Sequence, residues 1–131
     1  MDVPGDRVTR TTLARESCLA LLRDAAYARV VISLRCLPAA LPAHINVIGD
    51  HRLVLTSTED AVLAAARRGD VLSVQIDGLE PDGATWSVMA SGIAGVASSD
   101  EALTAPLRAA VAGGATLIAL PLSVLVGERV G

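Results

Sequence analysis

Short apolar segments rich in β-branched residues recur along the chain, and a turn signal follows most of them. Such segments are typical of β-strands, because branched side chains pack well on a pleated surface. Six strands are expected on this basis, in residues 28–37, 40–48, 51–57, 70–77, 84–97 and 116–130. Pro38 is expected to end the first strand, Gly92 and Gly95 to bend the fifth, and Pro121 to kink the last.

Three helical patterns lie between these strands. One helix is expected over residues 13–26, capped by Thr11 or Thr12, and another over residues 58–69, capped by Thr58 and ended by Gly69. A third is expected over residues 100–112, interrupted or restarted near Pro106. The pattern predicts a mainly β (α+β) fold, an antiparallel barrel of six strands with short helices. We expect one domain over residues 1–131, with residues 1–10 flexible.

Composition argues against several classes of partner. The chain has 131 residues, is 52% hydrophobic and carries a net charge of −3, with no basic cluster. All 11 basic residues are arginine, and one Trp, one Tyr and no Phe are available for base stacking, so no nucleic acid partner is expected. No apolar run reaches the roughly 18 residues that cross a bilayer, and the N-terminal residues lack a signal-peptide pattern. No membrane partner and a cytoplasmic location are therefore expected.

The thiols and imidazoles do not indicate a metal. Cys18 and Cys36 belong to no CxxC pair, and both are expected to be reduced and buried. His44 and His51 complete no ligand pattern with them, so no metal site is expected.

Residues 53–62, with the sequence LVLTSTEDAV, join the end of an expected strand to a hydroxyl cluster. Thr56, Ser57 and Thr58 can hydrogen-bond a phosphate, although Glu59 and Asp60 follow where a cation would be favoured. The alternative is purely structural, because acids in the first turn of a helix interact favourably with its dipole. The residues alone leave both interpretations open.

Further segments resemble a known family. PAHIN at residues 42–46, the hydroxyls at 56 and 57, Asp77, TWSV at 85–88 and SGIAGV at 91–96 follow one another in a characteristic order. In this order the chain resembles the pyridoxamine 5′-phosphate oxidase-like family of flavin-binding split barrels, in particular its small actinobacterial members. The resemblance covers nearly the whole chain.

The resemblance implies a homodimer that holds FMN, or a deazaflavin, in a groove between two barrels. The residues that would face the flavin ring are His44, Ile45 and Asn46. The residues that would donate hydrogen bonds to the phosphate are Thr56, Ser57 and Thr58. The residues that would help to form the pocket wall are Trp86 and Ser87.

The sequence departs from the family pattern at one important position. The helix lysine that would hold the phosphate falls on Ala61 or Val62. A charge-assisted hydrogen bond contributes roughly 1.5 to 3 kcal/mol, so its loss is expected to weaken phosphate binding about tenfold to a hundredfold. The arginines that could substitute for it are Arg29, Arg52, Arg67 and Arg68.

Two further side chains allow alternative roles. His44 is the single candidate for a proton donor, or it is a polar residue at the barrel mouth. Trp86 stacks on a ligand, or it packs in the core or an interface.

The expected function is an FMN- or deazaflavin-binding oxidoreductase-like protein acting on a small-molecule substrate. The alternative is a cofactor-free split-barrel dimer that binds a small molecule or has a non-redox activity. A mean hydropathy of +0.52 fits a large self-association surface.

Overall fold

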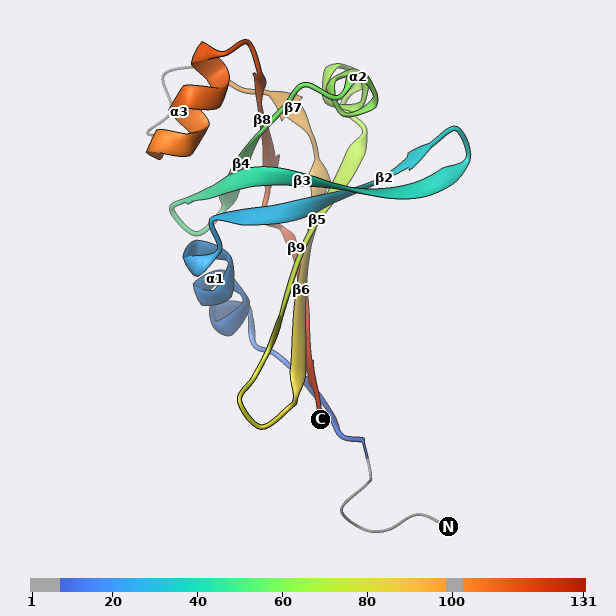
Figure 1. Cartoon of the computed structure of the whole chain (residues 1–131), viewed down its shortest axis with the longest axis vertical. Helices are drawn as coiled ribbons and strands as arrows, with labels where there is room; N and C mark the ends of the chain where they lie inside the picture. The colour runs from blue at the N-terminus through green and yellow to red at the C-terminus, as the bar shows by residue number, and fades with distance from the viewer. Residues whose placement is uncertain (1–7, 99–102) are drawn as a thin grey trace.

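The computed structural model describes residues 8–98 and 103–131, in which a strongly curved antiparallel sheet is flanked by short helices (Figure 1). The strands are β1 (Arg10–Thr12), β2 (Tyr27–Leu34), β3 (Leu37–Ile48), β4 (Arg52–Ser57), β5 (Val71–Leu79), β6 (Thr85–Ile93), β7 (Gly95–Val96), β8 (Thr116–Pro121) and β9 (Val124–Val130). The helices are α1 (Arg15–Asp24), α2 (Asp60–Arg68) and α3 (Ala105–Ala112).

The sheet closes on itself through one long, broken strand. Its order is β1-β9-β6-β5-β2-β3-β4-β8-β7, and β7 follows β6 after a single residue, Ala94. The β6 part of this strand pairs with β5 and β9, whereas the β7 part pairs with β8. The predicted mainly β antiparallel barrel is thereby confirmed.

The strand number differs from the expectation for local reasons. In the described residues there are nine strands rather than six, because two expected strands are each divided and β1 is additional. The fifth expected strand divides at Ala94 into β6 and β7, beside the glycines expected to bend it. The last divides after Pro121, where Leu122 and Ser123 separate β8 from β9.

Pro38 does not end a strand, which corrects the first expectation. The chain reverses at Arg35 and Cys36, which have φ values of 51° and 65°, as in a tight hairpin turn. Pro38 lies in β3 opposite Ser33 of β2. It is tolerated there because, within the described residues, β3 pairs with β4 only from Ile45 onward, so this part of β3 lies at a sheet edge.

Cys36 is exposed, not buried as expected, and both cysteines are free.

The first helix begins later than predicted. α1 starts at Arg15 with Ala14 as its N-cap, whereas Thr11 and Thr12 belong to β1 and pair with β9. The expected flexibility of residues 1–10 falls mainly on residues 1–7, which lie outside the described residues; Arg10 pairs with Val130.

The start of α2 differs from expectation, whereas α3 begins beside Pro106, where a restart of the helix was expected. The N-cap of α2 is Glu59 and not Thr58, but Gly69 ends the helix with φ 72°, as predicted. The structure describes α3 from Ala105, with Pro106 in its first turn, and residues 100–102 of the expected helix lie outside the described residues.

The barrel interior is aliphatic. Residues at alternate strand positions point inward, and each fully buried Val, Leu or Ile contributes roughly 1.5 to 3 kcal/mol. The inward set includes Leu53, Leu55, Leu72, Val74, Val88, Ile118 and Leu120. α1 packs closely on β9, where a Cβ at Gly127 would lie 2.5 Å from Cys18 Sγ. Burial raises the pKa of the Cys18 thiol.

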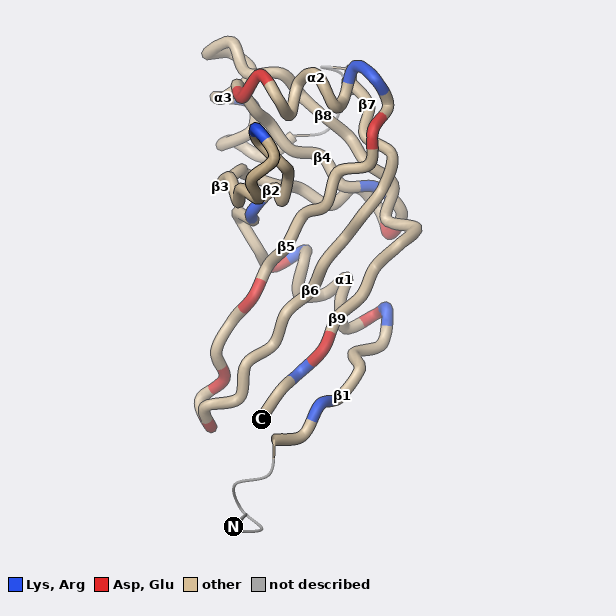
Figure 2. Tube along the Cα trace, turned by 90° about the vertical axis from the view of Figure 1, so that its right-hand side faces the viewer, with Lys and Arg blue, Asp and Glu red and all other residues tan. Residues whose placement is uncertain are grey.

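The strands β5, β6 and β9 lie side by side in an extended layer, and β6 carries no charged residue along its length (Figure 2). Within residues 8–98 and 103–131, no helix combines the length and the apolar character that crossing a membrane requires.

Candidate functional site

A pocket of about 370 Å³ opens where β4 ends and α2 begins. β3, the β4–α2 junction and α3 supply its walls. It is lined by Leu41, Pro42, Ala43, His44, Thr56, Ser57, Thr58, Glu59, Ala110 and Ala115. We call it the hydroxyl pocket. The structure therefore brings His44 together with the three hydroxyl residues that the sequence singled out.

The hydroxyl pocket offers hydrogen-bond donors. Thr56 is only 7% exposed, at the end of β4. Ser57 Oγ accepts a hydrogen bond from the Glu59 backbone N–H at 3.1 Å, which leaves the Ser57 O–H free to donate elsewhere. Among the described residues no side-chain hydrogen bond caps the α2 N-terminus, and its N-cap residue Glu59 lines the pocket. These donors fit a phosphate, while the charges of Glu59 and Asp60 oppose it.

The three predicted ring-facing residues do not share one environment. His44 is exposed and lines the hydroxyl pocket. Ile45 is buried in the barrel core, and its backbone N–H donates to the Ala26 carbonyl at 3.3 Å. Asn46 is partly buried and does not line the hydroxyl pocket. His44 is thus the member of this set whose side chain can contact a ligand in that pocket.

The two alternative lysine positions also differ. Val62 is 0% exposed and packs in the core, whereas Ala61 is partly exposed in the first turn of α2. No arginine is found among the described residues that line the hydroxyl pocket. The donors at this site are therefore neutral hydroxyls and backbone amides.

Trp86 and Ser87 lie outside the hydroxyl pocket. Trp86 lines a larger pocket of about 530 Å³ between α1, β2 and β5, which we call the aromatic pocket. Ser87 lines two smaller depressions on β6 and β9. Within one copy of the chain, the predicted wall residues and the predicted phosphate residues therefore occupy different pockets.

The aromatic pocket contains residues that the sequence patterns did not single out. Its lining is Leu21, Asp24, Ala25, Ala26, Tyr27, Ala28, Arg29, Gln75, Ile76, Asp77 and Trp86. Arg29 Nη1 lies 3.4 Å from Asp77 Oδ1, in a partly exposed ion pair. The sequence could have indicated Tyr27 as a candidate, because it is the one tyrosine in the chain and directly follows an expected helix.

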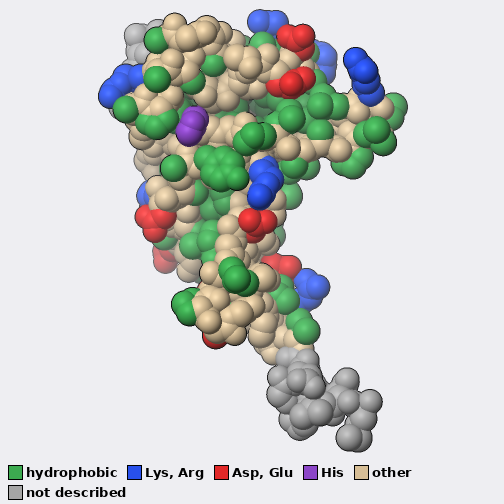
Figure 3. Space-filling model, in the orientation of Figure 1, with side chains coloured by type: hydrophobic (Ala, Val, Ile, Leu, Met, Phe, Trp, Pro, Cys, Tyr) green, Lys and Arg blue, Asp and Glu red, His purple; other side chains and the backbone are tan. Residues whose placement is uncertain are grey.

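The two pockets lie on either side of the paired strands β2 and β3. Tyr27 of the aromatic pocket is opposite His44 of the hydroxyl pocket, and Arg29 is opposite Pro42. Figure 3 shows hydrophobic side chains at the centre of the view, with acidic and basic groups beside them.

Residues 14–118 match the family model described as pyridoxamine 5′-phosphate oxidase. The chain belongs to this family. The resemblance seen in the sequence is thereby confirmed. No curated protein matches the chain.

Solved structures related to this pyridoxamine 5′-phosphate oxidase-family protein share its split-barrel fold. A FAD-binding protein from Mesorhizobium loti is 15% identical, with a TM-score of 0.74 over 95% of this chain and 99% of the relative. A FAD-binding protein from Mycobacterium smegmatis is 20% identical, with a TM-score of 0.67 over 92% and 98% of the two chains. A flavocytochrome from Azotobacter vinelandii is 19% identical, with a TM-score of 0.64 over 87% and 66%.

Proposed function

We propose that this family member binds a flavin, with its phosphate in the hydroxyl pocket, and acts as an oxidoreductase on a small molecule. The observation that carries the proposal is the convergence of Thr56, Ser57, Thr58 and His44 on one pocket. FAD-binding proteins among the structures of the same fold support it. Bound flavin would supply the redox chemistry, and the polypeptide would supply binding, orientation and electrostatics.

The side chains have distinct roles in this proposal. Ser57 donates its O–H to a phosphate oxygen while its own oxygen accepts from Glu59, so the loop geometry is fixed before the ligand arrives. Thr56 and Thr58 add hydroxyl donors on either side. His44 flanks the ligand and is the one candidate for proton transfer in this pocket.

Charge favours some flavins over others. The FMN phosphate is a monoester with about two negative charges, against about one on each phosphate of FAD. Arginine is missing from the described lining and Glu59 is present, so each extra negative charge is penalised. The two phosphates of FAD are bonded to each other and together carry about the same charge as the FMN phosphate, so this penalty applies to both. It is smaller for a deazaflavin linked through a single phosphodiester.

We further propose that the protein is a homodimer. Five aliphatic side chains on the outer face of β5, β6 and β9 are between 39% and 64% exposed, namely Val71, Met89, Ile93, Val124 and Val126. They are neighbours, because Val71 is opposite Ile93 and Met89 is opposite Val126. Self-association would remove this outer apolar face from water.

Flavin binding is tested by titration. The fluorescence of FAD or FMN should change saturably on addition of the protein. Ser57→Ala and Thr58→Ala should each weaken FAD binding about threefold to tenfold, because each removes one hydrogen bond worth about 1 kcal/mol. Thr58→Ala should melt at the wild-type temperature, since Thr58 is exposed, whereas Ser57→Ala should melt slightly lower because it also loses the hydrogen bond from the Glu59 N–H.

Ser33→Ala is the matched control, because Ser33 is exposed on the β2–β3 hairpin away from the pocket. Its affinity for FAD should equal that of the wild type. Unchanged emission with both flavins would contradict the proposal and favour the cofactor-free alternative.

A further inference from the structure

Both aromatic residues of the chain line the aromatic pocket. The sequence contains one Trp, one Tyr and no Phe, and Trp86 and Tyr27 come from different strands. The fully buried core is aliphatic, and Trp86 is partly buried against its edge while it also lines the pocket. Two rings from different strands at one cavity offer a ligand an aromatic surface.

Trp86 is held by a close approach to the backbone of β5. Gly78 is its cross-strand partner, and a Cβ at position 78 would collide with the indole ring. The ring therefore lies directly against Gly78. This contact fixes the indole, and its remaining surface forms the pocket wall.

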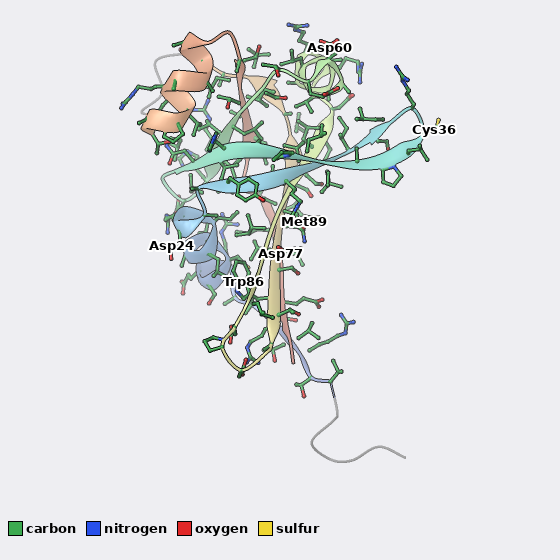
Figure 4. All side chains as sticks on the ribbon, viewed as in Figure 1. Asp24, Cys36, Asp60, Asp77, Trp86 and Met89 are labelled. Carbon is green, nitrogen blue, oxygen red and sulfur yellow. The ribbon has the colours of Figure 1, made fainter. Side chains whose placement is uncertain are left out.

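The pocket has a negative electrostatic character. The last turn of α1 forms one wall, and a helix C-terminus carries partial negative charge. Asp24, the last residue of α1, lines the pocket, although an acid at a helix C-terminus is unfavourable by about 0.3–1 kcal/mol. Asp77 lies across from it on β5, and Figure 4 shows Asp24, Asp77 and Trp86 on the same side of the molecule.

The nearby arginines neutralise only part of this charge. Arg23, in the last turn of α1, donates instead to the Gly49 carbonyl at 2.8 Å. Arg15 donates to the carbonyls of Leu122 and Asp50. Arg29 lines the pocket and pairs with Asp77 at 3.4 Å, so the charged lining residues, Asp24, Asp77 and Arg29, sum to −1.

We propose that the aromatic pocket binds a small organic cation, an alkyl- or arylammonium group, against Trp86 and Tyr27. Carboxylates beside aromatic faces attract ammonium groups through charge and cation–π interactions. The apolar walls formed by Leu21, Ala25 and Ile76 accommodate the carbon body of such a ligand. This inference goes beyond the proposed function, because it holds whether or not a flavin binds.

The test uses the fluorescence of Trp86, the one tryptophan in the chain, in flavin-free full-length protein. The probes are phenethylammonium, the neutral 2-phenylethanol and the anionic 3-phenylpropionate. Phenethylammonium should change the emission saturably and bind about tenfold more tightly than the alcohol, and the carboxylate should bind more weakly than the alcohol.

Substitutions give effects of opposite sign. Asp24→Asn should weaken phenethylammonium binding about threefold to tenfold, and Arg29→Gln should strengthen it about threefold, because it removes a competing cation. Asp24→Asn should not lower the melting temperature, since it relieves an acid at a helix C-terminus. Asp60→Asn, on exposed α2 outside the pocket, is the matched control and should bind as the wild type does.

Three results would overturn the inference. These are equal affinity for the ammonium and the alcohol, an unchanged affinity in Asp24→Asn, and the absence of saturable binding. Flavin titration of the same samples reports separately on the hydroxyl pocket, so each proposal can fail without the other.

Discussion

The two positions on which the family lysine falls, Ala61 and Val62, differ in burial. Val62 is fully buried against the barrel, whereas Ala61 is partly exposed and adjacent to Asp60. A lysine ammonium can reach an anion from position 61, but at position 62 its stem would start in the core. We therefore propose Ala61 as the counterpart of the family lysine.

A lysine introduced at position 61 should supply the positive charge that the phosphate site lacks. Ala61→Lys is expected to strengthen FMN binding about tenfold to a hundredfold, because it adds one charge-assisted hydrogen bond to a doubly charged phosphate. A fluorescence titration of the wild type and the variant with FMN would measure the gain.

Val62→Lys is the matched comparison. It should lower the free energy of unfolding by more than about 2 kcal/mol, since it replaces a buried side chain with a desolvated charge. Equal FMN affinity in Ala61→Lys and the wild type would contradict the phosphate location.

At the scale of elements, the break between β6 and β7 closes the barrel. A Cβ at Gly92 would lie 2.6 Å from the Pro121 carbonyl oxygen of β8, so the two strands can cross this closely only over a glycine. Gly95, three residues later, has no atom within 4 Å of such a Cβ. The two glycines of one segment therefore have different roles.

Alanine substitutions distinguish these roles. Gly92→Ala should lower the free energy of unfolding by about 2–3 kcal/mol, because a new methyl group overlaps a backbone oxygen that cannot rotate away. Gly95→Ala should change it by less than about 0.5 kcal/mol. Urea denaturation followed by circular dichroism measures both, and similar values for the two variants would argue against a closure role for Gly92.

At the scale of the whole molecule, the outer apolar face of β5, β6 and β9 is large and uncharged at its centre. The ion pairs Arg10–Glu128 and Arg29–Asp77 lie around it, so each charge is already compensated. Two copies can therefore meet through this face without like-charge repulsion.

A charge at the centre of that face should separate the copies. Val126→Glu is expected to weaken dimerisation at least about tenfold, because a carboxylate would be desolvated between two apolar sheets. Light scattering after size exclusion should give about twice the 13.4 kDa chain mass for the wild type and close to one chain mass for the variant at micromolar concentration.

Leu37→Glu is the control, since Leu37 is 68% exposed at the hairpin turn outside this face. A monomeric wild type would remove the basis for the dimer.

Local patterns predicted much of the fold. The strand expected over residues 70–77 is present as β5, and Gly69 correctly ended α2 because it supplies a left-handed conformation. Pro38 was misjudged because its pairing with Ser33 outweighed its usual preference. For the site, the order of motifs predicted Thr56 as a candidate, and β3 and α3 then complete the pocket around it.

The sequence by itself determined the strand pattern, the family and the candidate hydroxyls, because all of these depend on residues near one another in the chain. Only the tertiary structure decided that Trp86 lies away from those hydroxyls and beside Tyr27 and Asp24. It also decided that Val62 is sealed in the core. These are contacts between distant segments, and barrel closure sets them through packing that no local preference encodes.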